Sequence, residues 1–552
     1  MLCAAALCLL GACSSAVADD SSTNSSAPVA APAPAPTPTP APTAAAASES
    51  GGVYDTSVGT VVDADGFASL PLRSGAHRYF VKNGGSDANG CSNAQNPATP
   101  LATIAAGMAC VTAGNGDQVV LAEGSTFNEK LPWLSSKGGY SAQYPTVISS
   151  YNPADPTNES EIGRGDQRGA RPVLNPGGAL VDGGPVSYIA IKGLDFNPGN
   201  IPGQGLTFNG DGTNGTGGAN YVLIENNLFR YSGITLVDGG DGYTTTPRTQ
   251  HLIIRNNSIY GVWSSTDAQH VGGIYVEGAD GVTIEDNVIW HTGWKVGVSR
   301  DTGPNTGGPT IFNHPIYLQA NCGTEIVRRN LVMDNSADGG IARGSNITWQ
   351  ENVAIKSPNG FGLGAGNPQD FTGQPNGSLV DASYNLSVGA VDLTSTQPRG
   401  QGYTLANLAS GSKIHNNLLI YSDATPNSAD QAVATTGGSG YGFPTRPTYT
   451  DFENNVAFHW SASSLVVLSQ FGSPITSTYA NNLWDEAASG TNGNSQTAVF
   501  PQPYTQAQLY SALTPTYPSI TDYNSLVNYA IAHPEAHVQR TLRSLAFAGY
   551  GL

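Results

Sequence analysis

One six-residue pattern returns along most of this chain: an apolar residue, a polar residue, Asn or another polar residue, Asn, and two mostly apolar residues. Its copies are Ile224–Phe229, Ile254–Ile259, Ile284–Ile289, Val327–Val332, Trp349–Ala354, Ser383–Val388, Ile414–Leu419, Phe452–Ala457 and Tyr479–Trp484. The second Asn positions of successive copies are 22 to 43 residues apart. A period of this size indicates stacked units that bury a core only by contacting their neighbours.

Within each repeat the apolar residues alternate in short runs rich in Val and Ile, as in Val282-Thr283-Ile284. This is the periodicity of a strand, and 68 Gly with 36 Pro argue against units built from helix pairs. An Asn at one place in every coil fits a tight bend with a left-handed backbone, and stacked Asn side chains can hydrogen-bond from coil to coil. The sequence therefore predicts a parallel β-helix. In the same turn row, Asp286 is expected to satisfy its local backbone, and Arg328 and Arg329 to be solvated.

The start of the repeat region has motifs of its own, namely Tyr79-Phe80-Val81, Gly84–Asp87, Pro100–Ile104 and Gly116–Leu121. With these motifs and the repeats, the chain resembles the right-handed parallel β-helix superfamily that includes pectate lyases and related exported polysaccharide-active proteins. The resemblance covers about residues 77–552. It implies an all-β, single-stranded right-handed parallel β-helix of about ten or more coils.

Both ends of the repeat region show helical patterns. Ile104, Met108 and Val111 have the spacing of an amphipathic helix that covers the open edge of the first coil. Segments 525–529 and 538–545 read as helical and are expected to pack against the other end or the side. We divide this part of the chain into an N-terminal cap with the first coil (52–125), the parallel β-helix (126–500) and a C-terminal extension with helices (501–552).

The N-terminus is predicted to be a targeting segment. The apolar residues 2–12 are too few for a membrane span, so we interpret 1–12 as a signal peptide of the lipoprotein type. Leu10–Cys13 resembles a bacterial lipobox, which implies lipidation of Cys13. Residues 13–51 are an Ala/Pro-rich disordered tether. We expect an exported bacterial protein, lipid-anchored to the outer membrane or cell surface, or otherwise secreted by an ordinary signal.

Export determines how the remaining cysteines are interpreted. An oxidising compartment favours a Cys91–Cys110 disulfide and leaves Cys322 as a buried thiol.

The net charge of −18, from 23 Lys plus Arg and 41 Asp plus Glu, excludes a general nucleic-acid binder. We expect contact with a membrane only through the lipid anchor, and we expect the protein to be a monomer.

Aligning the strands before three of the Asn turns predicts a groove. With Ile274, Ile316 and Ile341 facing inward, Tyr275 and Tyr317 point outward on adjacent coils, and Glu277 and Gln319 share their face. The same alignment turns Arg343 inward, where an unpaired charge is costly. We therefore expect the strand to bend, so that Arg343 reaches the groove or pairs with Asp338.

Other reactive residue types gather near these strands. His270, His314 and Asp338 precede them, and an insertion at about 292–312 carries Trp294, Lys295 and Arg300 and is expected to overhang the groove. The predicted catalytic residues are His314, Tyr317, Arg343 and Arg300. The predicted substrate-binding residues are His270, Tyr275, Glu277, Lys295, Gln319, Asp338 and Trp294.

This set suits cleavage of an acidic, uronate-containing polysaccharide by β-elimination, which requires a base, a cation for the carboxylate and an acid for the leaving oxygen. His314 or Arg343 is the expected base, and Tyr317 the acid or base. Arg300, Lys295 or a bound calcium is the expected neutraliser. No motif fixes a metal site, so calcium is the one cofactor considered.

Two other functions remain open. A glycoside hydrolase requires two carboxylates that flank the scissile bond, and Glu277, Asp301, Asp334 and Asp338 are the candidates. A non-catalytic glycan-binding adhesin would have uniform coils with few reactive residues on their outer faces. The strongly acidic composition counts against a polyanionic substrate unless the groove is locally positive or bridged by calcium.

Overall fold

The computed structural model describes residues 61–62, 67–165, 170–175, 181–182, 186–209, 218–237, 249–266, 271–364, 377–396, 400–406, 408–421, 431–435, 450–459, 479–484, 495–497 and 504–552. The predicted signal peptide, the lipidation site Cys13, the tether and His270 lie outside the described residues. In the described part, no helix is long and apolar enough to cross a membrane.

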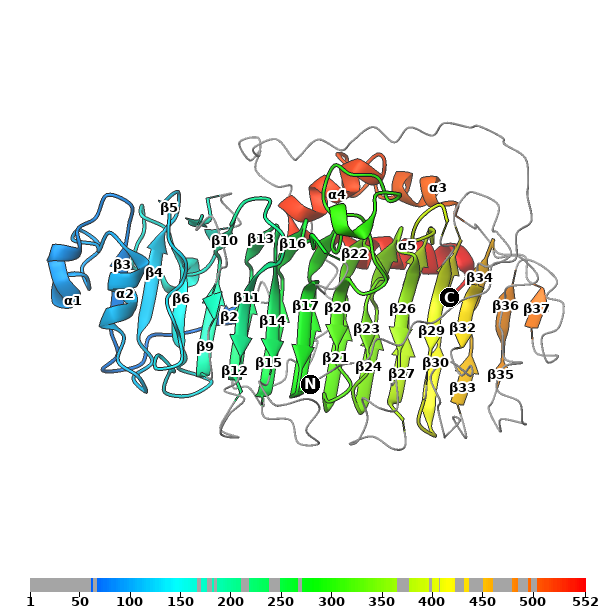
Figure 1. Ribbon diagram of the computed structural model, residues 1–552, viewed down its shortest axis with the longest axis horizontal. Helices are drawn as coiled ribbons and strands as arrows, with labels where there is room; N and C mark the ends of the chain where they lie inside the picture. The colour runs from blue at the N-terminus through cyan, green and yellow to red at the C-terminus, as the bar shows by residue number, and fades with distance from the viewer. Residues whose placement is uncertain are drawn as a thin grey trace, which may run out of the picture.

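Three parallel sheets wind around one core. Among the described residues, sheets 1 and 2 have 13 strands each and sheet 3 has nine. The chain visits the sheets in turn, so hydrogen-bonded neighbours belong to successive coils, which lie side by side along the long axis (Figure 1). This pairing confirms the predicted parallel β-helix. The parallel pairing begins with β3 and β4.

The strand bounds follow the order of the coils. Sheet 1 consists of β3 (Arg78–Val81), β4 (Gln118–Ala122), β6 (Thr146–Tyr151), β9 (Ser187–Lys192), β12 (Asn220–Glu225), β15 (Thr249–Arg255), β18 (Ala279–Glu285), β21 (Thr324–Arg328), β24 (Asn346–Gln350), β27 (Leu379–Ser383), β30 (Ser412–His415), β33 (Thr450–Glu453) and β35 (Tyr479–Ala480). Sheet 2 consists of β5 (Thr126–Phe127), β7 (Val173–Leu174), β10 (Asp195–Phe196), β13 (Leu228–Arg230), β16 (Ser258–Tyr260), β19 (Val288–Trp290), β22 (Leu331–Met333), β25 (Val353–Ile355), β28 (Leu386–Val388), β31 (Leu418–Ile420), β34 (Val456–Phe458), β36 (Asn482–Trp484) and β37 (Ser495–Thr497). Sheet 3 consists of β8 (Val181–Asp182), β11 (Gln204–Asn209), β14 (Ser232–Val237), β17 (Gly272–Glu277), β20 (His314–Leu318), β23 (Ile341–Ala342), β26 (Asn359–Leu363), β29 (Gln401–Leu405) and β32 (Gln431–Thr435). A separate antiparallel pair joins β1 (Val61–Val62) to β2 (Ala68–Ser69).

The core lies inside the coils. In sheet 1 the inward row runs in register through Ile224, Ile254, Ile284, Val327 and Trp349, all of them buried. Because side chains alternate between the two faces of a strand, each coil adds residues to the same inward rows. The apolar positions of the repeat therefore become stacks along the axis.

The second Asn of each repeat forms a buried ladder. Asn287 is typical: its Nδ2 donates to the Ile254 carbonyl at 2.9 Å and to Asn330 Oδ1 at 3.0 Å. Its Oδ1 accepts from the backbone N–H and the Nδ2 of Asn257, each at 3.0 Å. The same coil-to-coil bonds link the remaining members of the row, from Asn227 through Asn352, Asn385, Asn417 and Asn455 to Asn482. The expected Asn ladder is confirmed.

The left-handed bend lies one residue earlier than expected. Positive φ angles occur at the residue before each ladder Asn, as at Asn256 (54°), Asp286 (55°) and Arg329 (57°). The ladder position itself instead requires an amide that both donates and accepts. The bend therefore accepts several residue types, whereas the ladder repeats Asn.

We expect Asn287→Ala to lower the free energy of unfolding by about 2 kcal/mol, because it leaves a buried carbonyl and a buried N–H without partners. The matched control is Asn346→Ala at the exposed start of β24, where a change of a few tenths of a kcal/mol is expected. Denaturant unfolding followed by circular dichroism measures both. Equal effects of the two substitutions would contradict a stabilising ladder.

The N-terminal cap forms as predicted. Helix α2 (Ile104–Cys110) buries Ile104 and Met108 against the first coil, and the Thr103 hydroxyl caps it by accepting from the Ala106 N–H. The disulfide between Cys91 and Cys110 is present and ties α2 to α1 (Gly90–Asn93). Cys322 is buried and, in the described part of the chain, forms no disulfide.

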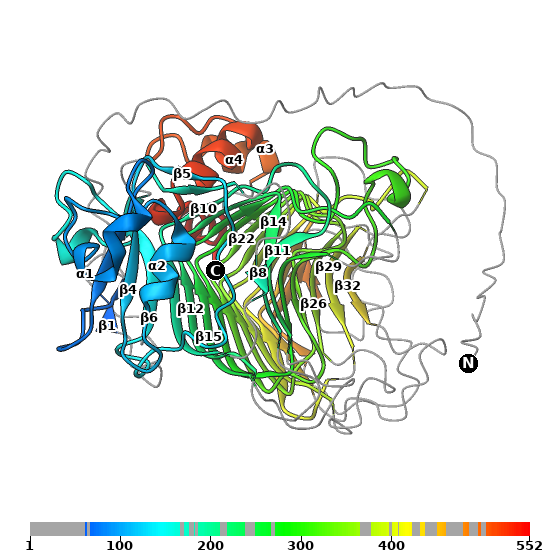
Figure 2. The same cartoon turned by 60° about the vertical axis from the view of Figure 1, so that its left-hand side comes forward.

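The C-terminal extension packs along the side of the β-helix. Helices α3 (Gln506–Ser511), α4 (Tyr523–Ala532) and α5 (Val538–Tyr550) share one apolar cluster with the outward residues of sheet 2, from Tyr260 to Phe458. Figure 2 shows α3 and α4 over sheet 2, on a different side of the coils from β26, β29 and β32. Both predicted helical segments, 525–529 and 538–545, lie within α4 and α5.

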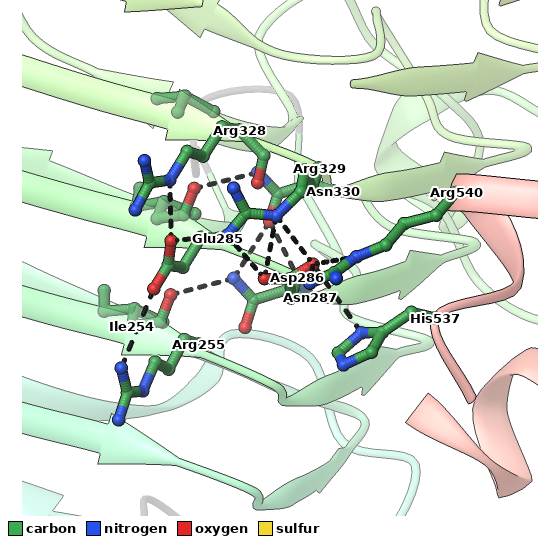
Figure 3. A network of polar contacts seen from close by, with 12 residues as sticks. Ile254, Arg255, Glu285, Asp286, Asn287, Arg328, Arg329, Asn330, His537 and Arg540 are labelled. Atoms are coloured by element: carbon green, nitrogen blue, oxygen red, sulfur yellow. Dashed lines mark hydrogen bonds and ion pairs between the residues drawn. The ribbon is translucent and has the colours of Figure 1, made fainter. Parts of the chain in front are cut away.

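Charged residues of the turn row hold α5 in place, which corrects the expectation for Asp286 and the two arginines (Figure 3). Asp286 is buried and accepts from Arg329 Nη2 at 2.8 Å and from Arg540 Nη2 at 2.9 Å. Arg328 Nε binds Glu285 Oε2 at 2.7 Å. Despite burial, the pKa of Asp286 is lowered by the neighbouring His537 ring and by the guanidinium groups of Arg329 and Arg540. These residues pair with one another rather than with solvent or local backbone.

Candidate functional site

Two tyrosines of sheet 3 form the centre of the outward strip. Tyr275 on β17 and Tyr317 on β20 are in register, and their ring centroids are 5.4 Å apart in an edge-to-face arrangement. Both are half-buried. The Tyr275 hydroxyl donates to Glu277 Oε2 at 2.8 Å, and burial followed by the Glu277 charge raises the pKa of Tyr275. Tyr275 therefore stays protonated and is suited to hydrogen bonding rather than proton transfer.

Tyr317 has a different environment. Its hydroxyl donates to Gln319 Oε1 at 3.1 Å and accepts from Arg343 Nη1 at 2.9 Å. The Arg343 guanidinium also lies 5.1 Å from the centroid of the Tyr317 ring. The predicted strip of Tyr275, Glu277, Tyr317 and Gln319 is thus brought together, with Arg343 beside it.

Arg343 reaches the strip through a register that differs from the expected one. Ile341 pairs with Tyr317, and Ala342 with Leu318. Ile341 is therefore an outward residue and Ala342 an inward one, which leaves Arg343 on the outer face. No bend that turns an inward Arg outward is required, and the alternative pairing with Asp338 is wrong.

Asp338 instead binds His314. Nδ1 of His314 lies 2.7 Å from Asp338 Oδ2, and both side chains are buried. In the described part of the chain, Nε2 of His314 makes no hydrogen bond to protein. The His314 ring meets the Tyr317 ring edge-to-face at 4.8 Å. Asp338, predicted to contact substrate, is fully buried and orients His314, so that Nε2 is the nitrogen available beside Tyr317.

Arg300 belongs to a second cluster, at the corner between sheets 2 and 3. Its Nη2 binds Asp334 Oδ1 at 2.9 Å, and its guanidinium lies over the Trp294 ring at 4.9 Å. His291 Nδ1 lies 3.3 Å from the other Asp334 oxygen. Arg300 and His291 lower the pKa of Asp334 against the effect of burial. Arg300 is therefore already paired with a carboxylate, and Trp294, predicted to bind substrate, is buried beneath it.

The insertion rests on neighbouring coils. Lys295 Nζ lies 4.8 Å from the centroid of the Trp263 ring. The Asp301 carboxylate accepts from the backbone N–H of Ser395 at 2.7 Å. The Thr310 N–H donates to Ser336 Oγ at 2.7 Å. These contacts fix the insertion against the corner between sheets 2 and 3.

Sequence reasoning missed that corner cluster, although a signal for it exists. His291, Asp334 and Lys356 each lie four residues after a ladder Asn, and all three have positive φ. They therefore occupy one row on successive coils, where charge and ring contacts accumulate. Extending the repeat by two residues would have grouped them.

The acidic side chains of the described residues do not gather into a metal-binding cluster. No group of three or more His, Cys, Asp or Glu side chains converges among them in a way that could hold a metal ion. The hydrolase candidates are also engaged: Glu277 with Tyr275, Asp301 with Ser395, Asp334 with Arg300 and Asp338 with His314. The strip is thus an arrangement of His, Tyr and Arg with one accessible carboxylate, Glu277, among its described residues.

Comparisons with known proteins identify no family. No family model matches the chain. No curated protein matches it in sequence. Solved structures with a related shape include a lacto-N-biosidase from Eubacterium ramulus, 12% identical over 74% of this chain and 63% of that one, TM-score 0.33. A rhamnogalacturonan lyase is 14% identical over 79% of this chain and 92% of that one, TM-score 0.38. XylC, solved with xylose, is 12% identical over 77% and 87%, TM-score 0.42. This chain's own strand pairing establishes it as a parallel β-helix protein, the architecture implied by the resemblance to the pectate-lyase-like superfamily.

Proposed function

We propose that this protein is a polysaccharide lyase that cleaves an acidic, uronate-containing polysaccharide by β-elimination on the strip of sheet 3. The observation that carries the proposal is the 2.9 Å contact from Arg343 to the Tyr317 hydroxyl, next to the 2.7 Å pair of His314 and Asp338. One base or acid, one oriented imidazole and one cation are the groups that this reaction requires.

In the proposed reaction His314 Nε2 removes the proton at C5 of the uronate. Arg343 neutralises the adjacent carboxylate, which stabilises the charge that develops as the C5–H bond breaks. The C4–O4 bond then breaks, a C4=C5 double bond forms, and O4 takes its proton from Tyr317. Asp338 holds the His314 tautomer, and Tyr275 and Gln319 hydrogen-bond the sugar. We assign no step to calcium.

The test is a panel of pectate, alginate and bacterial exopolysaccharides incubated with the purified protein, with and without calcium. Ultraviolet absorbance reports the conjugated double bond, and a reducing-end assay reports chain cleavage. We expect both signals to rise together. Reducing ends without absorbance would favour a hydrolase, and binding without either signal would favour a glycan-binding adhesin.

Substitution of Arg343 gives a charge-specific prediction. We expect Arg343→Gln to lower kcat/KM on the acidic polymer by about 100-fold or more, and Arg343→Lys to retain part of the activity, because the cation acts on the carboxylate. Methyl-esterified substrate is the matched control, since it has no charge to neutralise. An equal loss on both substrates would contradict this role.

A further inference from the structure

Two large apolar side chains are exposed immediately before the strand that carries His314. Ile311 and Phe312 are each 41% exposed. The other large apolar residues exposed in the described part of the chain are spread along it, and none is adjacent to another: Trp133, Tyr140, Leu379, Tyr384 and Leu552. An adjacent apolar pair on a surface marks a contact site more strongly than single exposed residues do.

The backbone beneath this pair is held firmly. The Phe312 N–H donates to Thr310 Oγ1 at 2.9 Å, and Thr310 is buried and exchanges hydrogen bonds with Ser336, each at 2.7 Å. On the other side, Asn313 is buried, and its Nδ2 donates to the Gly293 carbonyl at 2.7 Å. The backbone that carries Phe312 is thus held in place, so binding there requires little further ordering of the main chain.

Phe312 also lies close to the proposed reaction centre. Phe312 is two positions before His314, so their Cα atoms are at most about 7 Å apart along an extended chain. The C–H face of a pyranose ring is apolar, and burying it against an aromatic ring removes both surfaces from water. The outward tyrosines Tyr275 and Tyr317 are in register on β17 and β20, and β20 begins at His314.

We propose that Phe312, with Ile311 beside it, forms an apolar subsite that stacks on the pyranose unit next to the one bound at His314. This inference rests on the proposed function and specifies where the site binds a second sugar unit of the polymer. The occupant is a neighbouring sugar unit of the same polysaccharide, recognised by its ring face rather than by its carboxylate.

The experiment compares Phe312→Ala, Phe312→Tyr and Leu379→Ala. Leu379 is a matched control because it is 42% exposed but lies on sheet 1. Dissociation constants for galacturonate, mannuronate and guluronate hexamers are measured by titration calorimetry on the Tyr317→Phe background, and KM and kcat on the active protein. We expect Phe312→Ala to raise the dissociation constant and KM about tenfold with kcat kept within about twofold, and the other two substitutions to leave both near the parent.

Different results would overturn the apolar subsite and the lyase function. Full lyase activity with parent-like KM and hexamer affinity in Phe312→Ala would overturn the subsite and leave the lyase. Weaker hexamer binding by Phe312→Ala, in a protein without lyase activity, would support the subsite and overturn the lyase. A parent protein that binds none of the three hexamers would overturn both, and a tenfold effect of Leu379→Ala would overturn the subsite.

Discussion

We expect His314→Asn to lower kcat by about 1000-fold or more on the polysaccharide that the protein cleaves, with little change in KM. The imidazole is the proposed proton acceptor, and general-base catalysis contributes factors of this size. The asparagine amide can still donate to Asp338 from a position near that of Nδ1, so the buried contact of 2.7 Å keeps a donor. The loss is therefore expected in chemistry and not in folding.

Two further substitutions make this result specific. Asp338→Asn is expected to lower kcat by about 100-fold or more, because an amide no longer selects the His314 tautomer that leaves Nε2 free. His251→Asn is the matched control, since His251 stacks on Tyr221 of sheet 1 at 4.5 Å, outside the strip. Steady-state kinetics measure kcat and KM for all three variants, and circular dichroism shows whether each variant is folded. Parent-like kcat in His314→Asn would exclude His314 as the base.

The second large effect concerns a carboxyl group inside the coils. Glu325 is on the inward side of β21, in register with Val282 and Ile347, and is fully buried. Neither of its oxygens is paired with a cation among the described residues, and burial raises its pKa well above the usual 4.5. The unfolded chain ionises this group above pH 4.5 while the folded chain keeps it protonated. Its contribution to stability is therefore fully present below that pH and is lost as pH rises toward the folded pKa.

Glu325→Gln removes this titration and keeps the side-chain shape. We expect the stability of the variant relative to the parent to increase with pH above 4.5, by about 1.4 kcal/mol per pH unit until the folded pKa is reached. Urea unfolding at several pH values between 4 and 8 measures the difference. Glu453→Gln, at a partly buried position of sheet 1, is the control for the same chemical change outside the core. Parallel curves for the parent and Glu325→Gln would contradict a protonated carboxyl.

The fold was predictable because the Asn ladder recurs in the sequence. An amide that must bond its counterparts on both adjacent coils cannot drift in position, so its spacing reveals each coil. Helix α2 and the Cys91–Cys110 disulfide followed from amphipathic spacing and from the compartment. These features depend on neighbouring residues or on strict repetition.

The site was less predictable. Strand β23 has only Ile341 and Ala342, and Gly340 before it has a φ of 142°, so no alternation of apolar and polar residues fixed its register. The pairing of Asp286 with Arg540 joins residues 254 positions apart, and that of His314 with Asp338 depends on the shape of a corner. Such contacts arise from the packed coils and have no local pattern.

The C-terminal helices affect how the β-helix unfolds. A stack of coils held only by nearest neighbours can lose its end coils one at a time. Here one apolar cluster joins the helices to sheet 2 from Tyr260 to Phe458. In addition, α5 bonds both Asp286 and Glu351, which belong to different coils. Detaching one coil in this stretch therefore disturbs the helices that hold the others, so the middle of the array is expected to melt as one cooperative unit while coils beyond it fray.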